Sequence, residues 1–290
     1  MPLKRLLLVG CGDIARRVLP YLRGHYRVFA LLRDRAQFPV WRQRGAQPIW
    51  ADLDDTASLR RLAGLAERIV YLAPPPGQGQ RDTRTRRFLA VLRRPKIGPK
   101  QIIYLSTSGV YGDCAGAMVS ETRPPRPTNA RAERRLDAET EWRRFGAQSG
   151  ARVSVLRVPG IYARERLPLE RLQKNLPALC AADDVFTNHI HADDLARLIC
   201  ATLRYGAPNR IYNASDDSAL KMGDYFDLVA DHFALPRAPR LAQEDAEKAL
   251  SPLQFSFMRE SRRLDNRRIK EELKAQLHFA HVALGLKAMY

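Results

Sequence analysis

The chain has 290 residues, 45% of them hydrophobic, which is enough for one large domain or a domain with a smaller lobe, and which excludes a disordered chain. The N-terminal apolar run "RLLLVG" is too short for a signal peptide, and no later run approaches the roughly 18 apolar residues of a membrane span, so we expect a cytoplasmic protein with no membrane partner. The formal net charge of +18 is spread over nearly every segment without a zinc-finger or aromatic–basic pattern, which argues against a specific nucleic-acid site.

Short apolar runs alternate with helical patterns along the chain. The predicted strands are 5–10, 27–32, 46–53, 68–73, 101–107, 152–158 and 210–215. The predicted helices are 13–23, 81–94, 129–148 and 193–204. This alternation indicates a parallel sheet covered on both faces, so we predict an α/β fold with a Rossmann-type doubly wound sheet. Residues 1–160 and about 188–216 would form the cofactor domain, and 161–187 with 217–290 a small C-terminal substrate-binding lobe.

A glycine-rich turn follows the first strand. In "LLLVGCGDIA" the pattern Gly10-x-Gly12-x-x-Ala15 lies between a strand and a helix. Gly10 permits the tight turn, Gly12 lets the backbone approach a pyrophosphate, and Ala15 allows the helix to pack closely on the strand. The N-terminus of that helix attracts phosphate charge, so Asp13 and Ile14 also belong to the predicted site. The turn therefore predicts a dinucleotide cofactor.

The tip of the second strand bears on the choice between NAD and NADP. An acidic residue there binds the ribose 2′-hydroxyl, whereas in "LLRDR" Arg33 and Arg35 flank Asp34 and suit a 2′-phosphate. We therefore expect NADP to be preferred over NAD. Asp52, after the third strand, either accepts a hydrogen bond from the adenine amino group or caps the helix that starts near Thr56.

Four further segments follow in order: "STSGVYGD" (106–113), "LRVPGIYA" (156–163), "NHIHADDLARLI" (188–199) and "RIYNASDD" (210–217). With the glycine turn, they resemble the extended short-chain dehydrogenase/reductase superfamily, in particular the atypical members of its NAD-dependent epimerase/dehydratase group. The C-terminal "SRRLDNRRIKEEL" (261–273) strengthens the resemblance, which covers nearly the whole chain. It implies an NAD(P)-dependent oxidoreductase or epimerase/dehydratase-like protein with a small-molecule substrate.

The resemblance also implies roles for single residues. Thr107 falls where the family carries its catalytic Ser or Thr, whose hydroxyl can hydrogen-bond a substrate oxygen, and Ser108 is a nearby substitute. Pro159 and Gly160 belong to the segment that passes the nicotinamide. The remaining predicted cofactor contacts lie at the end of the fourth strand, at Leu72, Ala73 and Pro74.

The family's Tyr-x-x-x-Lys pair is absent from "RPTNARAERRLDAE" (126–139). Counting back from "LDAE", which resembles the end of the family motif, Arg131 takes the place of the tyrosine and Arg135 that of the lysine. A guanidinium stays charged at any working pH, so Arg131 is a poor proton donor. Arg135 can still hold the nicotinamide ribose or bind an anionic substrate group. The candidates for a substitute acid are Tyr111, Tyr162, His189 and His191.

We predict neither a metal site nor a disulfide. Cys11, Cys114, Cys180 and Cys200 lie far apart and form no Cys-x-x-Cys pair, which fits reduced thiols. The "HIHADD" segment has the His-x-His-x-Asp-Asp spacing of some hydrolytic metal sites, but no further ligand sits in a recognisable motif.

Two functions and two oligomeric states stay open at this point. The protein is either an NAD(P)-dependent enzyme of unknown substrate or a non-catalytic NAD(P)-binding regulator or redox sensor that lacks the acid–base pair. The resemblance implies a dimer through helices 81–94 and 129–148. Like charges on these helices would repel across a two-fold axis, which leaves monomer and homodimer equally open. The arginines concerned are Arg84, Arg86, Arg87, Arg134, Arg143 and Arg144.

Overall fold

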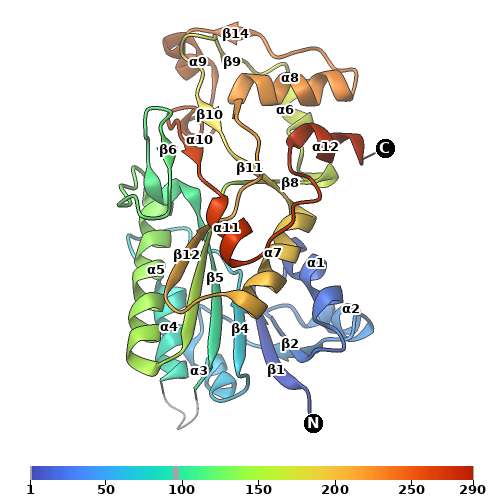
Figure 1. Cartoon of the computed structure of the whole chain (residues 1–290), viewed down its shortest axis with the longest axis vertical. Coiled ribbons are helices and arrows are strands. Elements are labelled where there is room, and N and C mark those ends of the chain that lie inside the picture. Colours follow the sequence, from blue (N-terminus) through green and yellow to red (C-terminus); the bar gives the residue numbers. More distant parts are fainter. Residues whose placement is uncertain (1, 94–97, 290) are drawn as a thin grey trace.

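The computed structural model describes residues 2–93 and 98–289 (Figure 1). Its centre is a seven-stranded parallel sheet with the strand order β12-β7-β5-β4-β1-β2-β3. The strands are β1 (Lys4–Val9), β2 (Tyr26–Leu32), β3 (Gln47–Trp50), β4 (Arg68–Tyr71), β5 (Gln101–Thr107), β7 (Arg152–Val158) and β12 (Arg210–Asn213). The strand order reverses between β1 and β4, which places a ligand crevice at the carboxyl ends of these two strands. The predicted doubly wound Rossmann-type fold is confirmed.

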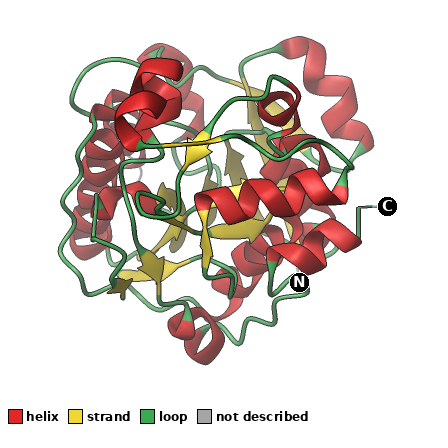
Figure 2. Ribbon diagram, turned by 90° about the horizontal axis from the view of Figure 1, so that it is seen from above, coloured by secondary structure: helices red, strands yellow, loops and turns green. Residues whose placement is uncertain are grey.

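Strand β1 shows why a continuous apolar run forms a central strand. Leu6 and Leu8 belong to the core on one face of the sheet, and Leu7 and Val9 belong to the core on the other. Helices cover both faces (Figure 2). The first core lies under α1 (Asp13–Leu22), α2 (Phe38–Gln43) and α7 (Ala192–Tyr205), and the second under α3 (Thr56–Leu59), α4 (Thr83–Leu92) and α5 (Ala130–Ser149). Burial on both sides explains why the strand lacks a polar alternation.

Side-chain caps set the ends of the helices near the site. The Oδ1 atom of Asn129 accepts a hydrogen bond from the Ala132 amide at 3.0 Å, so α5 begins at Ala130. It ends where Gly150 adopts a φ of 75°. Asp82 caps α4 in the same way, which corrects the predicted start at residue 81; the predicted end at residue 94 lies outside the described residues. Strand β3 ends three residues earlier than predicted, because Asp52 and the residues after it form a turn.

The segments predicted to form a lobe carry a buried core of their own above the carboxyl edge of the sheet (Figure 1). Tyr162, Leu172, Tyr225 and Phe255 belong to this core. Its helices are α6 (Leu169–Gln173), α8 (Met222–His232), α9 (Gln243–Ala249), α10 (Pro252–Ser256) and α12 (Val282–Lys287). Short strand pairs join these parts: β8 (Gly160–Tyr162) with β11 (His189–His191), β9 (Ala178–Leu179) with β14 (Arg240–Leu241), β10 (Phe186–Thr187) with β13 (Leu220–Lys221), and β6 (Met118–Val119) with β15 (Arg263–Leu264). Helix α11 (Arg267–Glu272) packs Ile269 into the first core.

Four of the six arginines that were expected to repel across a dimer of α4 and α5 have carboxylate partners within the chain. Arg84 and Arg87 pair with Asp54 at 2.6 and 3.4 Å. Arg86 pairs with Asp137 at 2.5 Å, and Arg144 pairs with Glu141 at 3.0 Å. These pairs remove much of the expected like-charge repulsion, so that argument against a dimer through α4 and α5 loses its force. In the described part of the chain, no helix is both long and apolar enough to cross a membrane.

Candidate functional site

The glycine-rich turn has the shape that a pyrophosphate requires. Gly10 has a φ of +89°, and a Cβ atom there would lie 2.4 Å from the Ala73 amide nitrogen, so only glycine fits between β1 and β4. A Cβ atom on Gly12 would meet nothing within 4 Å, so the backbone before α1 faces open space. Ile14 and Ala15 are buried and pack α1 on the sheet, so only their backbone can face a ligand. The turn therefore fits a dinucleotide.

Ion pairs connect the start of α1 to the chain that follows β8. The Asp13 carboxylate lies 3.0 Å from the Nε atoms of both Arg17 and Arg166. Arg17 also pairs with Glu165 and, at 2.6 Å, with Asp193 at the start of α7. Arg166 lines the cavity described below, in the 3-10 helix η4 (Arg164–Arg166). Ion pairs thus connect the glycine-rich turn and the cavity wall.

The tips of β2 and β3 carry both arginine and aspartate side chains. Arg33 is exposed, and its carbonyl accepts a hydrogen bond from Trp50 Nε1 at 3.1 Å. The Asp34 carboxylate folds back to accept from the Ala36 amide at 2.9 Å, where it caps η1 (Arg35–Gln37). Asp52 accepts from the Asp54 amide at 2.9 Å and does not cap the next helix. That cap is Asp55, which corrects one of the two predicted roles of Asp52.

The end of β4 closes the other side of the turn. The Leu72 amide donates to the Val9 carbonyl at 2.7 Å, which holds the two strand ends together. Ala73 packs against Gly10, and the Pro74 carbonyl accepts from Arg84 at 3.3 Å. The backbone of these three residues lies beside the glycine turn, and their contact with the cofactor stays a prediction.

A cavity of about 560 Å³ lies where β5 and β7 end. Its walls come from the end of β5 and the 3-10 helix η3 (Ser108–Tyr111), from the first turns of α5, from the segment after β7, and from the C-terminal part of the chain. The structure brings eight residues that the sequence singled out together on these walls: Thr107, Ser108, Arg131, Arg135, Pro159, Gly160, Tyr162 and His189. The residues of the glycine turn lie beside this cavity rather than on its walls, and Arg166 connects the two parts.

Two hydroxyl groups can donate hydrogen bonds into the cavity. Thr107 Oγ1 accepts from the Gly109 amide at 3.2 Å, which leaves the hydroxyl proton available. Ser108 also lines the cavity, and its hydroxyl makes no hydrogen bond to another described residue. A substrate oxygen in this cavity could therefore receive a hydrogen bond from the end of β5.

The two arginines at the positions of the missing pair have different surroundings. Arg135 Nη1 donates to the Leu105 carbonyl at 2.8 Å and to the Ala73 carbonyl at 3.3 Å, so one edge of the guanidinium is fixed to the ends of β5 and β4. Its remaining N–H groups can serve the cavity. Arg131 is exposed, and its guanidinium lies 4.9 Å from the centre of the Phe257 ring.

Tyr111 lies outside the cavity, so it is placed wrongly for an acid there. Its hydroxyl donates to Asn213 Oδ1 at 2.8 Å, and the Arg157 guanidinium lies 4.6 Å from the ring centre. Burial raises the pKa of this hydroxyl. The side chain is 1% exposed, because η3 turns it into a small core with Val119 and Leu264. The sequence could not reveal this turn of the ring away from the crevice.

Tyr111→Phe is therefore expected to affect stability rather than chemistry. The change removes one buried hydrogen bond to Asn213 and leaves its acceptor unsatisfied, which costs about 1–3 kcal/mol. Urea unfolding and cofactor titration of the same preparation measure the two effects. Weaker cofactor binding with unchanged stability would mean that the hydroxyl serves the site after all.

The other candidate acids are also poorly suited to donate a proton. The Tyr162 ring lines the cavity, but its hydroxyl lies against α12, where a Cβ atom on Gly285 would be 2.5 Å from the phenol oxygen. Burial raises the pKa of Tyr162. Burial lowers the pKa of His189 to about 3, so this imidazole is neutral at physiological pH. His191 Nδ1 accepts from the Asp193 amide at 3.2 Å and caps α7, which makes it a structural residue.

Several cavity residues have no signal in the sequence. Arg171, Tyr225 and Arg262 line the cavity from α6, α8 and the segment before β15. The Tyr225 ring lies 4.1 Å from that of His189, and Arg262 pairs with Glu260 at 2.8 Å. Arg171 and Tyr225 fall in segments without a motif, whereas Arg262 lies in the segment 261–273 that carried the resemblance but no role for this residue. Only the fold brings the three together.

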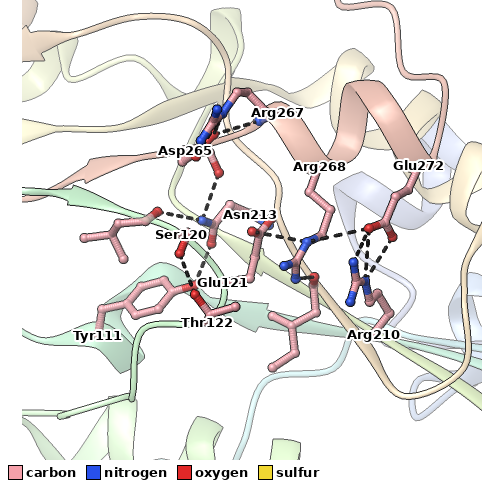
Figure 3. Close-up of polar contacts among 12 residues, drawn as sticks. Tyr111, Ser120, Glu121, Thr122, Arg210, Asn213, Asp265, Arg267, Arg268 and Glu272 are labelled. Carbon is pink, nitrogen blue, oxygen red and sulfur yellow. Dashed lines mark hydrogen bonds and ion pairs between the residues drawn. The ribbon is translucent and has the colours of Figure 1, made fainter.

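The C-terminal segment 261–273 is fixed beside the cavity by a polar network (Figure 3). Asn213 Nδ2 donates to the carbonyls of Val119 and Asp265, both at 3.0 Å. The Asn213 amide donates to Glu121 Oε1 at 3.0 Å, and Arg268 lies 3.4 Å from the same carboxylate. The network joins β12, β6 and α11, and so positions the wall that carries Arg262. Within residues 2–93 and 98–289, no cluster of three His, Cys, Asp or Glu side chains could hold a metal ion.

Comparisons with known proteins agree with this geometry. The dTDP-D-glucose 4,6-dehydratase of Homo sapiens is 27% identical over 122 residues, which are 39% of this chain and 35% of that protein. The chain therefore matches 35% of the length of this curated relative. A functionally unknown conserved protein from Silicibacter pomeroyi has a solved structure with a TM-score of 0.79 and 28% identity, and the match covers 99% of this chain and 98% of that one.

A second solved structure shows the fold alone, because its sequence identity is low. It is the dTDP-glucose 4,6-dehydratase of Streptomyces venezuelae with NAD bound, with a TM-score of 0.75 and 20% identity over 98% of this chain and 96% of that one. The family model described as "NAD dependent epimerase/dehydratase family" matches residues 6–215. With its glycine turn, sheet order and cavity at the ends of β5 and β7, this chain belongs to the NAD dependent epimerase/dehydratase family.

Proposed function

We propose that the protein binds NADP in preference to NAD and uses it in an oxidoreductase or epimerase/dehydratase-type reaction on a small molecule held in the cavity. The observation that carries the proposal is the placement of Thr107 and Ser108 on the cavity beside an open glycine turn. The cofactor would supply hydride transfer. The turn Gly10–Ala15 would hold its pyrophosphate, Asp52 its adenine, and Pro159 and Gly160 would flank its nicotinamide.

The cavity side chains would bind and orient the substrate. The hydroxyl of Thr107, with Ser108 beside it, would donate a hydrogen bond to the reacting oxygen. Arg135, fixed along one edge, would hold the cofactor ribose with its remaining N–H groups in place of the family's lysine. We assign no side chain as the acid, because the four tested candidates are buried, neutral or turned away from the cavity.

The preference for NADP makes Arg33 a test residue. Its exposed guanidinium can pair with a 2′-phosphate, and the neighbouring Asp34 carboxylate is already used in a cap. Arg33→Ala should weaken NADPH binding about tenfold, or 1.4 kcal/mol, and leave NADH binding nearly unchanged. Calorimetric titration with both cofactors measures this. Equal losses for the two cofactors would show that Arg33 does not read the 2′-phosphate.

A second candidate function is a regulator that binds the cofactor without turnover. The observation that favours it is the pair of arginines, Arg131 and Arg135, where the family carries its proton donor and its lysine. A screen of aldehydes, ketones and sugar nucleotides, followed by NADPH absorbance, separates the two candidates. Turnover of any substrate class supports the enzyme, and tight cofactor binding without turnover across the screen supports the regulator.

A further inference from the structure

The amino edge of the central sheet carries a group of cations, at the opposite end of the molecule from the C-terminal lobe (Figure 1). Two connected hollows of about 710 and 760 Å³ flank the start of β1 there, so each has room for a nucleotide. The hollows share Pro2, Leu3, Lys4 and Tyr26 as walls. The lysine and arginine residues that line them are called the edge cations: Lys4, Arg5, Arg23, Arg27, Arg68, Arg152 and Arg204.

The charge of these hollows is not balanced by carboxylates. Glu67 is the only carboxylate among the described residues that line them, and no edge cation lies within salt-bridge distance of it or of another described carboxylate. The whole chain has 49 basic and 31 acidic residues, so composition alone does not explain seven cations beside one acid. Like charges that share a surface repel, and a bound polyanion would relieve that repulsion.

Helix dipoles account for only part of this charge. Arg23 and Arg204 lie at the ends of α1 and α7, where the negative end of a helix favours a cation. The other five edge cations lie within the first two residues of a strand, and a sheet has only a small net dipole. Six of the seven are exposed, and Arg68 is half-buried. Most of the edge cations are therefore accessible to a ligand and lack a local electrostatic partner.

Exposed aromatic rings lie beside the edge cations. Tyr21 lines one hollow and is 45% exposed, and Tyr205 is 42% exposed. The Arg204 guanidinium lies 5.0 Å from the centre of the Tyr205 ring, and that of Arg68 lies 5.2 Å from the centre of the Tyr26 ring. Accessible rings next to guanidinium groups offer surfaces on which nucleic-acid bases stack.

We propose that the amino edge binds single-stranded nucleic acid without sequence preference, with the edge cations on its phosphates and the exposed tyrosines on its bases. A flexible strand can enter the two hollows, whereas a membrane surface would contact mainly the groups that project from them. An acidic polypeptide could pair with the cations but would bring no bases to stack on the rings. Binding of this kind rests on phosphate charge and stacking, so it needs none of the sequence motifs of specific recognition.

The test is fluorescence anisotropy of a labelled uridine oligonucleotide of about 20 nucleotides, titrated with the whole protein over a range of salt concentrations. The edge variant combines three substitutions of exposed edge cations: Lys4→Gln, Arg152→Gln and Arg204→Gln. The control variant removes the same charge from exposed positions away from the amino edge: Arg123→Gln, Arg143→Gln and Lys287→Gln.

We expect the control variant to bind as the wild type does, and the edge variant to bind at least about tenfold more weakly at about 50 mM salt. The slope of log affinity against log salt should become shallower by about two in the edge variant, because each lost phosphate contact removes about 0.7. Equal losses in the edge and control variants, or no binding by the wild type, would overturn the proposal.

Two further measurements test the kind of polyanion. Tyr21→Ala keeps every edge cation and should bind the oligonucleotide at least about fivefold more weakly, because it removes a stacking surface. An unchanged affinity in this variant would contradict stacking on the exposed ring. Poly-glutamate and phosphatidylserine vesicles are then used as competitors of the labelled oligonucleotide. If either competitor bound more tightly than the oligonucleotide, nucleic acid would be overturned as the partner of this surface.

Discussion

Gly12→Val is expected to abolish dinucleotide binding while the fold is kept. Gly12 has a φ of −93°, which any residue can adopt, and a Cβ atom there meets nothing within 4 Å. The valine side chain would occupy the open space in which we place the pyrophosphate, beside the start of α1. The affinity for NADPH should fall by about a hundredfold or more, or at least about 2.7 kcal/mol.

Two comparisons separate a blocked site from a damaged fold. Gly98→Val adds the same side chain near the amino end of β5, at the opposite edge of the sheet, and makes only an ordinary contact at 3.9 Å with the Leu92 carbonyl. It should bind NADPH as the wild type does. Gly10→Ala should instead unfold at lower temperature, because its Cβ atom would lie 2.4 Å from Ala73. Unchanged NADPH affinity in a folded Gly12→Val protein would show that the cofactor does not lie over this turn.

Glu139→Ala is expected to cause the largest loss of stability. Arg157 on β7 and Glu139 on α5 form an ion pair at 2.7 Å, with side chains only 3% and 2% exposed. The Ser106 hydroxyl donates to the same carboxylate at 2.5 Å. Removing the carboxylate leaves the Arg157 charge buried without a partner, which costs about 3–5 kcal/mol in the free energy of unfolding. Chemical denaturation of the purified variant measures this.

The double variant Glu139→Met with Arg157→Met is the informative control. It removes both charges, so it should recover most of the stability that either single change loses. Met is flexible enough to fill the space between α5 and β7. If Glu139→Ala cost less than about 1 kcal/mol in the free energy of unfolding, Arg157 would have to be hydrated or otherwise paired, contrary to the 3% exposure of its side chain.

Patterns of neighbouring residues in the sequence were sufficient to predict the strand, the glycine turn and the helix that surround the site. The run Leu6–Val9 is apolar because both faces of β1 are buried, and the two glycines after it occur where a strand turns into a helix. The predicted helix 129–148 corresponds to α5, whose ends lie next to Asn129, which caps it, and Gly150, which ends it. These features depend on neighbours along the chain, and for that reason a sequence pattern can report them.

The details of the cavity depend on contacts between distant segments. Tyr111 and Tyr162 both follow strands that end at the crevice, yet one turns into a small core and the other places its hydroxyl against α12. Arg84 and Arg87 pair with Asp54, which lies about thirty residues earlier in the sequence. The sequence alone therefore could not show that these arginines of α4 have a carboxylate partner. Arg171 and Tyr225 become neighbours of the cavity only when α6 and α8 fold over it. No spacing rule relates such residues.

The central claim is that this chain binds a dinucleotide at the glycine turn. The most direct test is a calorimetric titration of cofactor-stripped protein with NADPH and with NADH, at two salt concentrations. The account predicts one site per chain, a dissociation constant for NADPH in the micromolar range, and weaker binding of NADH. Absence of binding by both cofactors, in protein shown to be folded, would contradict it.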